Sequence, residues 1–173
     1  MLTWSRARKQ SARTAAELYG SIVTAARRET FYSEHGVPDT PDGRFAMLIA
    51  HTCLVLERLR REGPAGQELS RALVEAFVTD MDDCMREMGV GDLTVPRKVK
   101  KAAGALYDCA TEFRKAGAIG EAALAGAVHR NLLPSEPLAV AERVAAYMQK
   151  AGGELEAQPS ADLLSGRVAF AQI

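Results

Sequence analysis

Apolar residues recur along this chain at intervals of three and four, which is the period of an α-helix with one buried side. No segment shows the strict alternation of apolar and polar residues that is typical of a half-buried β-strand. In the third of six such segments, the stripe consists of Leu69, Leu73, Phe77, Met81, Cys84 and Met88. The pattern predicts helices over residues 11–30, 40–62, 66–88, from 96 past 113, 119–131 and 136–151.

Glycine and proline divide these segments where helices are expected to begin and end. Thr40 precedes a proline and makes a favourable N-cap, and Gly89 stands where a left-handed helix stop is expected. The sequence therefore predicts an all-α fold, a single compact multi-helix domain of about six helices with Gly-rich loops. We expect a basic flexible leader over residues 1–13, a helical domain over 14–152 and a loosely attached C-terminal tail over 153–173.

Composition narrows the class of protein. Of the 173 residues, 47% are apolar and 25% are charged, and the formal net charge is zero. Attraction to nucleic acid or acidic lipid therefore requires a local patch, and we expect no specific nucleic-acid binding. Three cysteines without a Cys-x-x-Cys pair fit a reducing compartment, and the longest uncharged apolar run, residues 45–56, is too short to span a membrane. We expect a cytoplasmic protein, at most peripheral at the inner face of the cytoplasmic membrane.

The predicted leader carries a local basic patch. Trp4 stands near Arg6, Arg8, Lys9 and Arg13, with no acidic residue among them. Because basic residues close to a bilayer attract anionic lipids, we expect weak peripheral membrane contact through this leader. The alternative is a disordered and solvated terminus.

Polar residues beside the apolar stripes indicate a buried network. On an ideal helix, Asp80 and Glu87 flank the stripe of the third segment, whereas Arg44 and His51 lie on the inner side of the second. A desolvated carboxylate requires a cation or several hydrogen-bond donors. We therefore predict a structural polar network that joins Arg44 or His51 to Asp80 or Glu87. A catalytic or metal-binding role for the same groups is the alternative.

Recognisable catalytic and cofactor motifs are absent from the sequence. His51 and Cys53 are two residues apart, so their side chains point to opposite sides of a helix and cannot share a metal ion. The aspartates around Asp82 are similar to clusters that hold magnesium diphosphate, but the second cluster of such enzymes is missing. Both Gly-rich loops are acidic and lack the lysine of a phosphate-binding loop. We expect no enzymatic activity, no cofactor and no metal.

The two Gly-rich loops and the basic segment that follows them are the predicted partner surface. Loops held by a rigid scaffold often carry binding groups. The predicted contact residues are Asp39, Asp42, Arg86, Asp92, Lys98, Lys100 and Lys101. The alternative is that the aspartates only cap turns and helix ends, and that the lysines form a solvated face.

Three segments carry a resemblance to a known family. They are LYGSIVTAAR at 18–27, FYSEHGVPDTPDGRFAMLIAHTCLVLERL at 31–59 and FVTDMDDCMREMGVGDLTVPRKVKKAA at 77–103. Through the series GVPDT, DGRF, DMD, REMGVGDL and VKK, the chain resembles the ubiquinol–cytochrome c chaperone family. The resemblance is close over residues 18–107 and loose elsewhere. The family usually has Phe-Tyr-Gly-Arg where this chain has Leu106-Tyr107-Asp108-Cys109, so one expected basic group is missing.

The resemblance implies a helical, non-enzymatic chaperone for the assembly of ubiquinol–cytochrome c reductase. Mitochondrial members attend newly made cytochrome b with a partner protein, which implies cytochrome b or another reductase subunit as the client, and a partner chaperone. The short leader favours a bacterial member. An alternative from another class is a helical carrier of a hydrophobic small molecule such as a quinone or an acyl chain.

Overall fold

Helices alone build the part of the chain that the structure describes. The structure, a computed structural model, describes the backbone of residues 2–172 and the side chains of residues 9–172. This range contains eight helical segments and no β-strand, which confirms the predicted all-α class. The segments are α1 (Leu2–Ala26), α2 (Thr30–Ser33), α3 (Pro41–Arg60), α4 (Gly63–Glu87), α5 (Val95–Ile119), α6 (Glu121–Asn131), α7 (Leu138–Ala157) and α8 (Ser160–Leu164).

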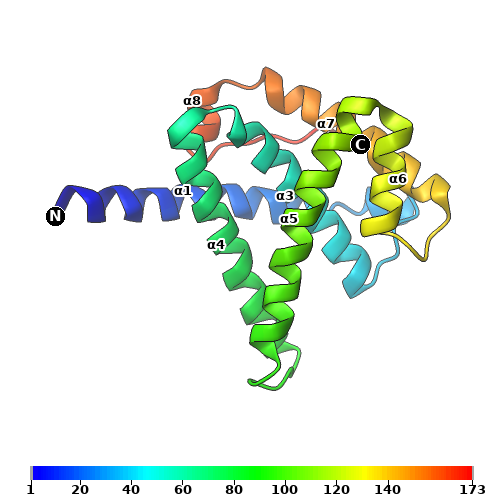
Figure 1. Cartoon of the computed structure of the whole chain (residues 1–173), viewed down its shortest axis with the longest axis horizontal. Helices are drawn as coiled ribbons and strands as arrows, with labels where there is room; N and C mark the ends of the chain where they lie inside the picture. The colour runs from blue at the N-terminus through cyan, green and yellow to red at the C-terminus, as the bar shows by residue number, and fades with distance from the viewer. Residues whose placement is uncertain (1, 173) are drawn as a thin grey trace.

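Helix α3 lies at the centre of the fold, since it packs against α1, α4, α5 and α7. Its buried residues occupy most sides of the helix, and they include Met47, Ile49, Val55 and Leu59. A helix that is apolar on most sides is stable only when its neighbours cover it. In Figure 1, α4 and α5 form a long hairpin whose connected end projects beyond the other helices.

Local sequence signals set the ends of α3 and α4. The hydroxyl of Thr40 accepts a hydrogen bond from the Gly43 N–H at 3.2 Å, which caps the start of α3. Gly89 follows α4 in the left-handed conformation, with φ of 76°. The next N–H, from Val90, donates to the carbonyl of Met85 at 3.0 Å and closes the helix end. The predicted cap and the predicted stop are confirmed.

The first helix is longer than the sequence pattern indicated. α1 begins at Leu2, so the backbone of the predicted leader is continuous with the helix that follows it. The side chains of Trp4, Arg6 and Arg8 lie outside the described residues. Within residues 2–172, no helix is both long enough and apolar enough to cross a bilayer.

The C-terminal segment packs onto the core, which differs from the loosely attached tail that we expected from residue 153 onward. α7 continues to residue 157, and Leu155, Leu163 and Phe170 are buried. The guanidinium of Arg28, just after α1, donates hydrogen bonds to the carbonyl oxygens of Phe170 and of the residue after it. A glycine pair and several charges gave this stretch the composition of a linker, although Leu155, four residues after Ala151, continues the apolar stripe of α7.

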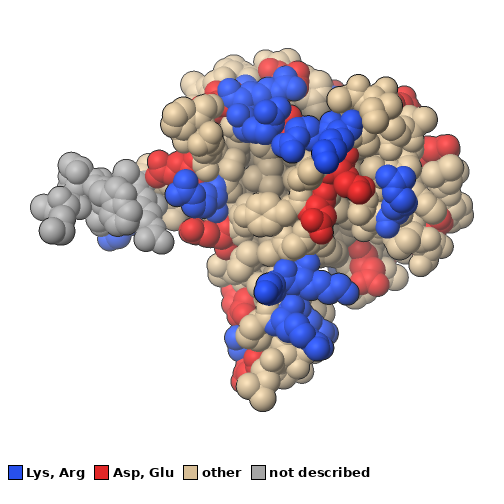
Figure 2. Space-filling model, viewed as in Figure 1, with Lys and Arg blue, Asp and Glu red and all other residues tan. Residues whose placement is uncertain are grey.

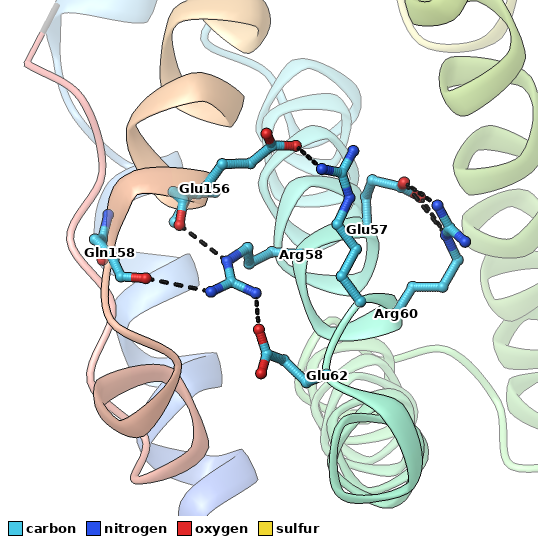
Figure 3. A network of polar contacts seen from close by, with 8 residues as sticks. Glu57, Arg58, Arg60, Glu62, Glu156 and Gln158 are labelled. Atoms are coloured by element: carbon cyan, nitrogen blue, oxygen red, sulfur yellow. Dashed lines mark hydrogen bonds and ion pairs between the residues drawn. The ribbon is translucent and has the colours of Figure 1, made fainter.

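A buried arginine ties α3 to the C-terminal end of α7, as Figure 3 shows, and a hydrogen bond to Ser160 also joins it to α8. Arg58 is only 8% exposed. Its guanidinium donates to the main-chain oxygens of Leu155 at 3.1 Å and Gln158 at 3.2 Å, and it forms an ion pair with Glu62. The hydroxyl of Ser160 joins the network through Arg58 at 3.2 Å and Glu62 at 2.9 Å. Because this cation lies at the C-terminal end of α7, it also complements the helix dipole.

Candidate functional site

A pocket of about 490 Å³ opens between α1, α3, α4 and α5. All four helices contribute to its walls, which are mainly apolar. The larger apolar side chains that line it are Val23, Phe45, Leu48, Met81, Met85 and Met88. The three methionines are flexible and polarisable, so they adapt to apolar surfaces of different shape. A concave, mostly apolar surface of this volume is typical of a binding site.

Charged residues from two separate predictions meet at this pocket. Asp42 and Arg44 come from the first turn of α3, Asp80 from α4, and Lys98 and Lys101 from α5. From the sequence, three of them were expected on a partner surface and two in a buried network. The structure brings all five to one opening, although a role in partner binding stays a prediction for each.

Positively charged side chains outnumber negatively charged ones in the lining of the pocket. Arg27, the residue after α1, also lines it, and the sequence reasoning missed this residue because its position matters only once α1 is docked. Four cations and two carboxylates therefore surround the opening of a chain whose net charge is zero. Among the described side chains, Arg27, Lys98 and Lys101 have no carboxylate within ion-pair distance. These three cations are available to an acidic partner.

The predicted partner of Asp80 was wrong. Its carboxylate accepts a hydrogen bond at 2.7 Å from the hydroxyl of Tyr19 on α1, and not from Arg44 or His51. Burial, followed by the hydrogen bond to Asp80, raises the pKa of Tyr19 far above its ordinary value, so the hydroxyl remains a donor. Arg44 instead pairs with Asp39 at 2.7 Å on the exposed surface. This hydrogen bond holds the pKa of the Asp39 carboxyl below its usual range.

His51 lies in the core, away from the pocket, so the network prediction was wrong for this residue too. Its Nδ1 is 2.7 Å from the carbonyl oxygen of Met47, and a carbonyl only accepts, so Nδ1 carries the proton. Its Nε2 accepts a hydrogen bond from the hydroxyl of Tyr147 at 2.9 Å. The rings of Phe31 and Phe170 pack edge-on against the imidazole. His51 is thus a satisfied, neutral member of an aromatic cluster.

The other predicted residues lie outside the pocket. Arg86 pairs with Asp82 at 2.6 Å, one turn earlier on α4, and with Asp92 in the connection to α5. Lys100 and Glu87 are exposed, and neither makes an ion pair within the described part of the chain, so Glu87 takes no part in the predicted network. The contact role of Arg86, Asp92 and Lys100 stays a prediction, and the intramolecular pair between the first two was not anticipated.

The chemical groups at the pocket suit binding. Burial, and then the charge of Asp80, raises the pKa of the Cys84 thiol, so this sulfur is protonated and weakly nucleophilic at neutral pH. Across residues 9–172, no three His, Cys, Asp or Glu side chains converge as the ligands of a metal ion would. What remains is an apolar surface with cations at its edge. Such a surface fits an apolar segment that carries or adjoins negative charge.

A second hollow of about 370 Å³ lies between α3, α4 and α5. Arg60, Arg71 and Arg114 line it, together with Tyr107, which is 57% exposed. The sequence reasoning did not identify this hollow, because its residues come from three helices and no motif marks them. Tyr107 belongs to the segment in which the chain departs from the family pattern.

Comparison with known proteins adds a family context. The family model described as ubiquinol-cytochrome C chaperone matches residues 33–170. Ubiquinol-cytochrome-c reductase complex assembly factor 1 of Xenopus laevis is 24% identical over 119 residues, which are 69% of this chain and 60% of that protein. The protein of the same name from Mus musculus is 24% identical over 152 residues, 87% of this chain and 52% of that protein. The chain thus spans between half and two thirds of the length of these relatives.

A solved structure shares the architecture. The crystal structure of the Cbp3 homolog from Brucella abortus matches with a TM-score of 0.84 and 34% sequence identity. The match covers 99% of this chain and 97% of that chain. It therefore extends over α1, which supplies one wall of the pocket and precedes the segment that the family model matches.

Proposed function

Because the chain belongs to the ubiquinol–cytochrome c chaperone family, we propose that it binds a protein client during assembly of ubiquinol–cytochrome c reductase, and that this client is cytochrome b. The observation that carries the proposal is the apolar pocket between α1, α3, α4 and α5, with its excess of cations. A membrane protein exposes apolar segments until it is assembled, and such a segment requires cover outside the bilayer.

The lining of the pocket fits a client of this kind. Met88 is 64% exposed and Met85 is half-buried, so both thioethers have room to adapt to an apolar segment. At the edge, the unpaired Arg27, Lys98 and Lys101 supply charge for an acidic group next to that segment. Apolar contact would give the client its affinity, and the cations would fix its orientation and discriminate against basic partners.

The predicted contact residues divide into two groups under this proposal. Asp42, Lys98 and Lys101 line the pocket and would contact the client directly. We propose that the remaining residues extend the contact along the two Gly-rich loops; they are Asp39, Arg86, Asp92 and Lys100. A partner chaperone, which the family resemblance implies, is also part of this proposal.

We expect Met85→Asp to reduce the amount of cytochrome b that co-purifies with the protein and the amount of assembled reductase, each by more than half. The substitution places a charge on the apolar wall, where an apolar client segment could not solvate it. The measurement replaces the cell's own gene with the variant. It quantifies the co-purified subunit by mass spectrometry and the reductase by native electrophoresis.

Val74→Asp is the matched control. Val74 is also half-buried on α4, but it lines the second hollow. Equal thermal midpoints of the two variants would show that both fold equally well. If Met85→Asp retains its client and a normal reductase level, the pocket is not the client site. If deletion of the gene leaves the reductase at its normal level, the assembly role itself is wrong.

The carrier alternative retains one supporting observation, which is that the volume of the pocket lies in the range of small-molecule sites. On this reading, native mass spectrometry of the purified protein detects a bound quinone or acyl chain that Met85→Asp releases. The chaperone proposal expects the protein to be free of any such ligand at its calculated mass. Retention of a hydrophobic molecule by the wild type alone would therefore favour the carrier.

A further inference from the structure

The connection between α4 and α5 exposes large apolar side chains at the end of the projecting hairpin seen in Figure 1. This connection, residues 88–94, is called the hairpin tip below. Leu93 is 99% exposed and Met88 is 64% exposed. Two of the five large apolar side chains that the described surface exposes thus lie within seven residues of each other. Nothing in the fold accounts for a leucine that contacts almost no other part of the chain.

The hairpin tip has a defined conformation. Gly89 is left-handed, the Val90 N–H donates to α4, and the Thr94 N–H donates to the carbonyl of Gly91 at 2.7 Å. The ion pair between Arg86 and Asp92 spans the turn. Leu93 is therefore presented outward by its backbone. Arg86, which is shared with Asp82, thus partly offsets the negative charge of Asp92 at the tip.

Four cations follow directly behind the hairpin tip. Arg97, Lys98, Lys100 and Lys101 occupy the first two turns of α5 and are all exposed, and no described carboxylate lies within ion-pair distance of them. Figure 2 shows Lys and Arg gathered on the viewed face of the hairpin, with Asp and Glu along one edge. Asp83 and Glu87 are the exposed acids nearest in sequence on α4. The hairpin thus has separated basic and acidic sides, although the whole chain is neutral.

We propose that the hairpin tip binds an anionic lipid surface, with Leu93 in the interfacial layer and the cations of α5 against the phosphate groups. The arrangement of the groups fits this partner. The apolar end of the hairpin would reach the bilayer first, and the cations lie directly behind it. A tip of seven residues is small for a protein partner, since a stable interface covers about 800 Å² of each protein. A lipid surface needs no such area, because one inserted side chain and several cations are sufficient for reversible binding.

Membrane binding by the hairpin tip does not require the client, but the lipid surface and the proposed client surface share residues. Met88, Lys98 and Lys101 belong both to the hairpin and to the lining of the pocket. A hairpin tip seated on lipid therefore places the opening of the pocket next to the bilayer surface. A client segment would then pass between pocket and membrane over a short distance.

The test measures how the full-length protein partitions onto vesicles of phosphatidylcholine with phosphatidylglycerol, and onto vesicles of phosphatidylcholine alone. We expect binding only to the anionic vesicles. Arg97→Gln combined with Lys100→Gln should weaken it roughly 25-fold, since each basic residue at the surface contributes a factor of about five. Leu93→Ser should weaken it several-fold. Arg114→Gln combined with Lys115→Gln removes two exposed cations from the other end of α5 and should have no effect.

A spectroscopic readout locates the contact. In a protein with Trp4→Phe, the substitution Leu93→Trp provides a single indole, whose emission should shift to shorter wavelength on anionic vesicles alone. Unchanged emission, or wild-type binding by both the Leu93→Ser and the Arg97→Gln, Lys100→Gln proteins, overturns the proposal. If Arg6→Glu with Arg8→Glu abolishes binding while the hairpin variants do not change it, the leader is the membrane contact instead. If the hairpin variants bind vesicles normally but lose a co-purified protein, the tip is a protein contact.

Discussion

Replacing Arg58 with methionine should lower the free energy of unfolding by at least about 3 kcal/mol. The guanidinium donates to the main-chain oxygens of Leu155 and Gln158, and a hydrogen bond from a charged group contributes about 1.5–3 kcal/mol. Methionine keeps much of the side-chain volume but supplies no donor, and Glu62 loses its cation. For a chain of this length, the midpoint of thermal unfolding should fall by roughly 6–12 °C.

Arg60→Met is the matched control on the same helix. Arg60 forms an ion pair with Glu57 at 2.8 Å, but its side chain is 53% exposed, and exposed pairs contribute little to stability. The control should therefore unfold at nearly the wild-type temperature. Equal shifts for Arg58→Met and Arg60→Met would mean that the network in Figure 3 does not hold α7 and α8 against α3.

Acidification should destabilise the protein through His51 by about 2–3 kcal/mol between pH 7 and pH 4.5. Burial lowers the pKa of His51 to about 4, against a hydrogen bond to Met47 that raises it, and the charge of Arg28 lowers it further. In the unfolded chain the imidazole has an ordinary pKa of about 6.5. Between pH 6.5 and pH 4 the unfolded chain therefore binds a proton at this residue, whereas the imidazole of the folded chain stays neutral. The contribution of His51 to the free energy of unfolding is therefore complete above pH 6.5 and is lost as the pH falls toward 4.

Urea unfolding at both pH values measures this effect, and His51→Gln isolates it from the carboxylates. The variant should be less stable than the wild type at pH 7, because glutamine lacks the imidazole ring against which Phe31 and Phe170 pack. Its stability should fall less between the two pH values, since glutamine does not titrate. Parallel loss of stability in both proteins would show that other groups dominate the pH dependence.

The sequence was sufficient for the class of fold and for several helix ends, because these depend on local properties. The spacing of apolar residues records which side of a helix is buried, and Thr40 and Gly89 act within one turn of their own positions. The packed C-terminal segment could not be predicted in this way. Gly152 lies inside α7, and a Cβ there would make an ordinary contact with Leu54 of α3 at 3.7 Å, so a residue that suggested a linker belongs to a packed helix.

The composition of the pocket was partly predictable, but its contacts were not. Helical angles correctly placed Asp80 beside an apolar stripe, yet they could not identify Tyr19, which is 61 residues away and becomes a neighbour only through the docking of α1 on α4. A phenolic hydroxyl satisfies that carboxylate without a cation. Tertiary contacts decide which polar groups meet. Because Asp80 is hydrogen-bonded to Tyr19, Arg44 is not needed there and instead pairs with the nearby Asp39 at the surface.

The anchoring of the C-terminal segment by Arg28 has a consequence for synthesis of the chain. The guanidinium and the carbonyl oxygen that accepts its hydrogen bond are 143 residues apart. At the usual speed of translation, of about 5–20 residues per second, roughly 7–30 seconds separate the emergence of α1 from that of the segment that completes its packing. During this interval the apolar faces around Phe31 and α3 lack their cover. Until its last segment is made, this chain therefore has an open core that is prone to aggregation, which is the condition that we propose it relieves in its client.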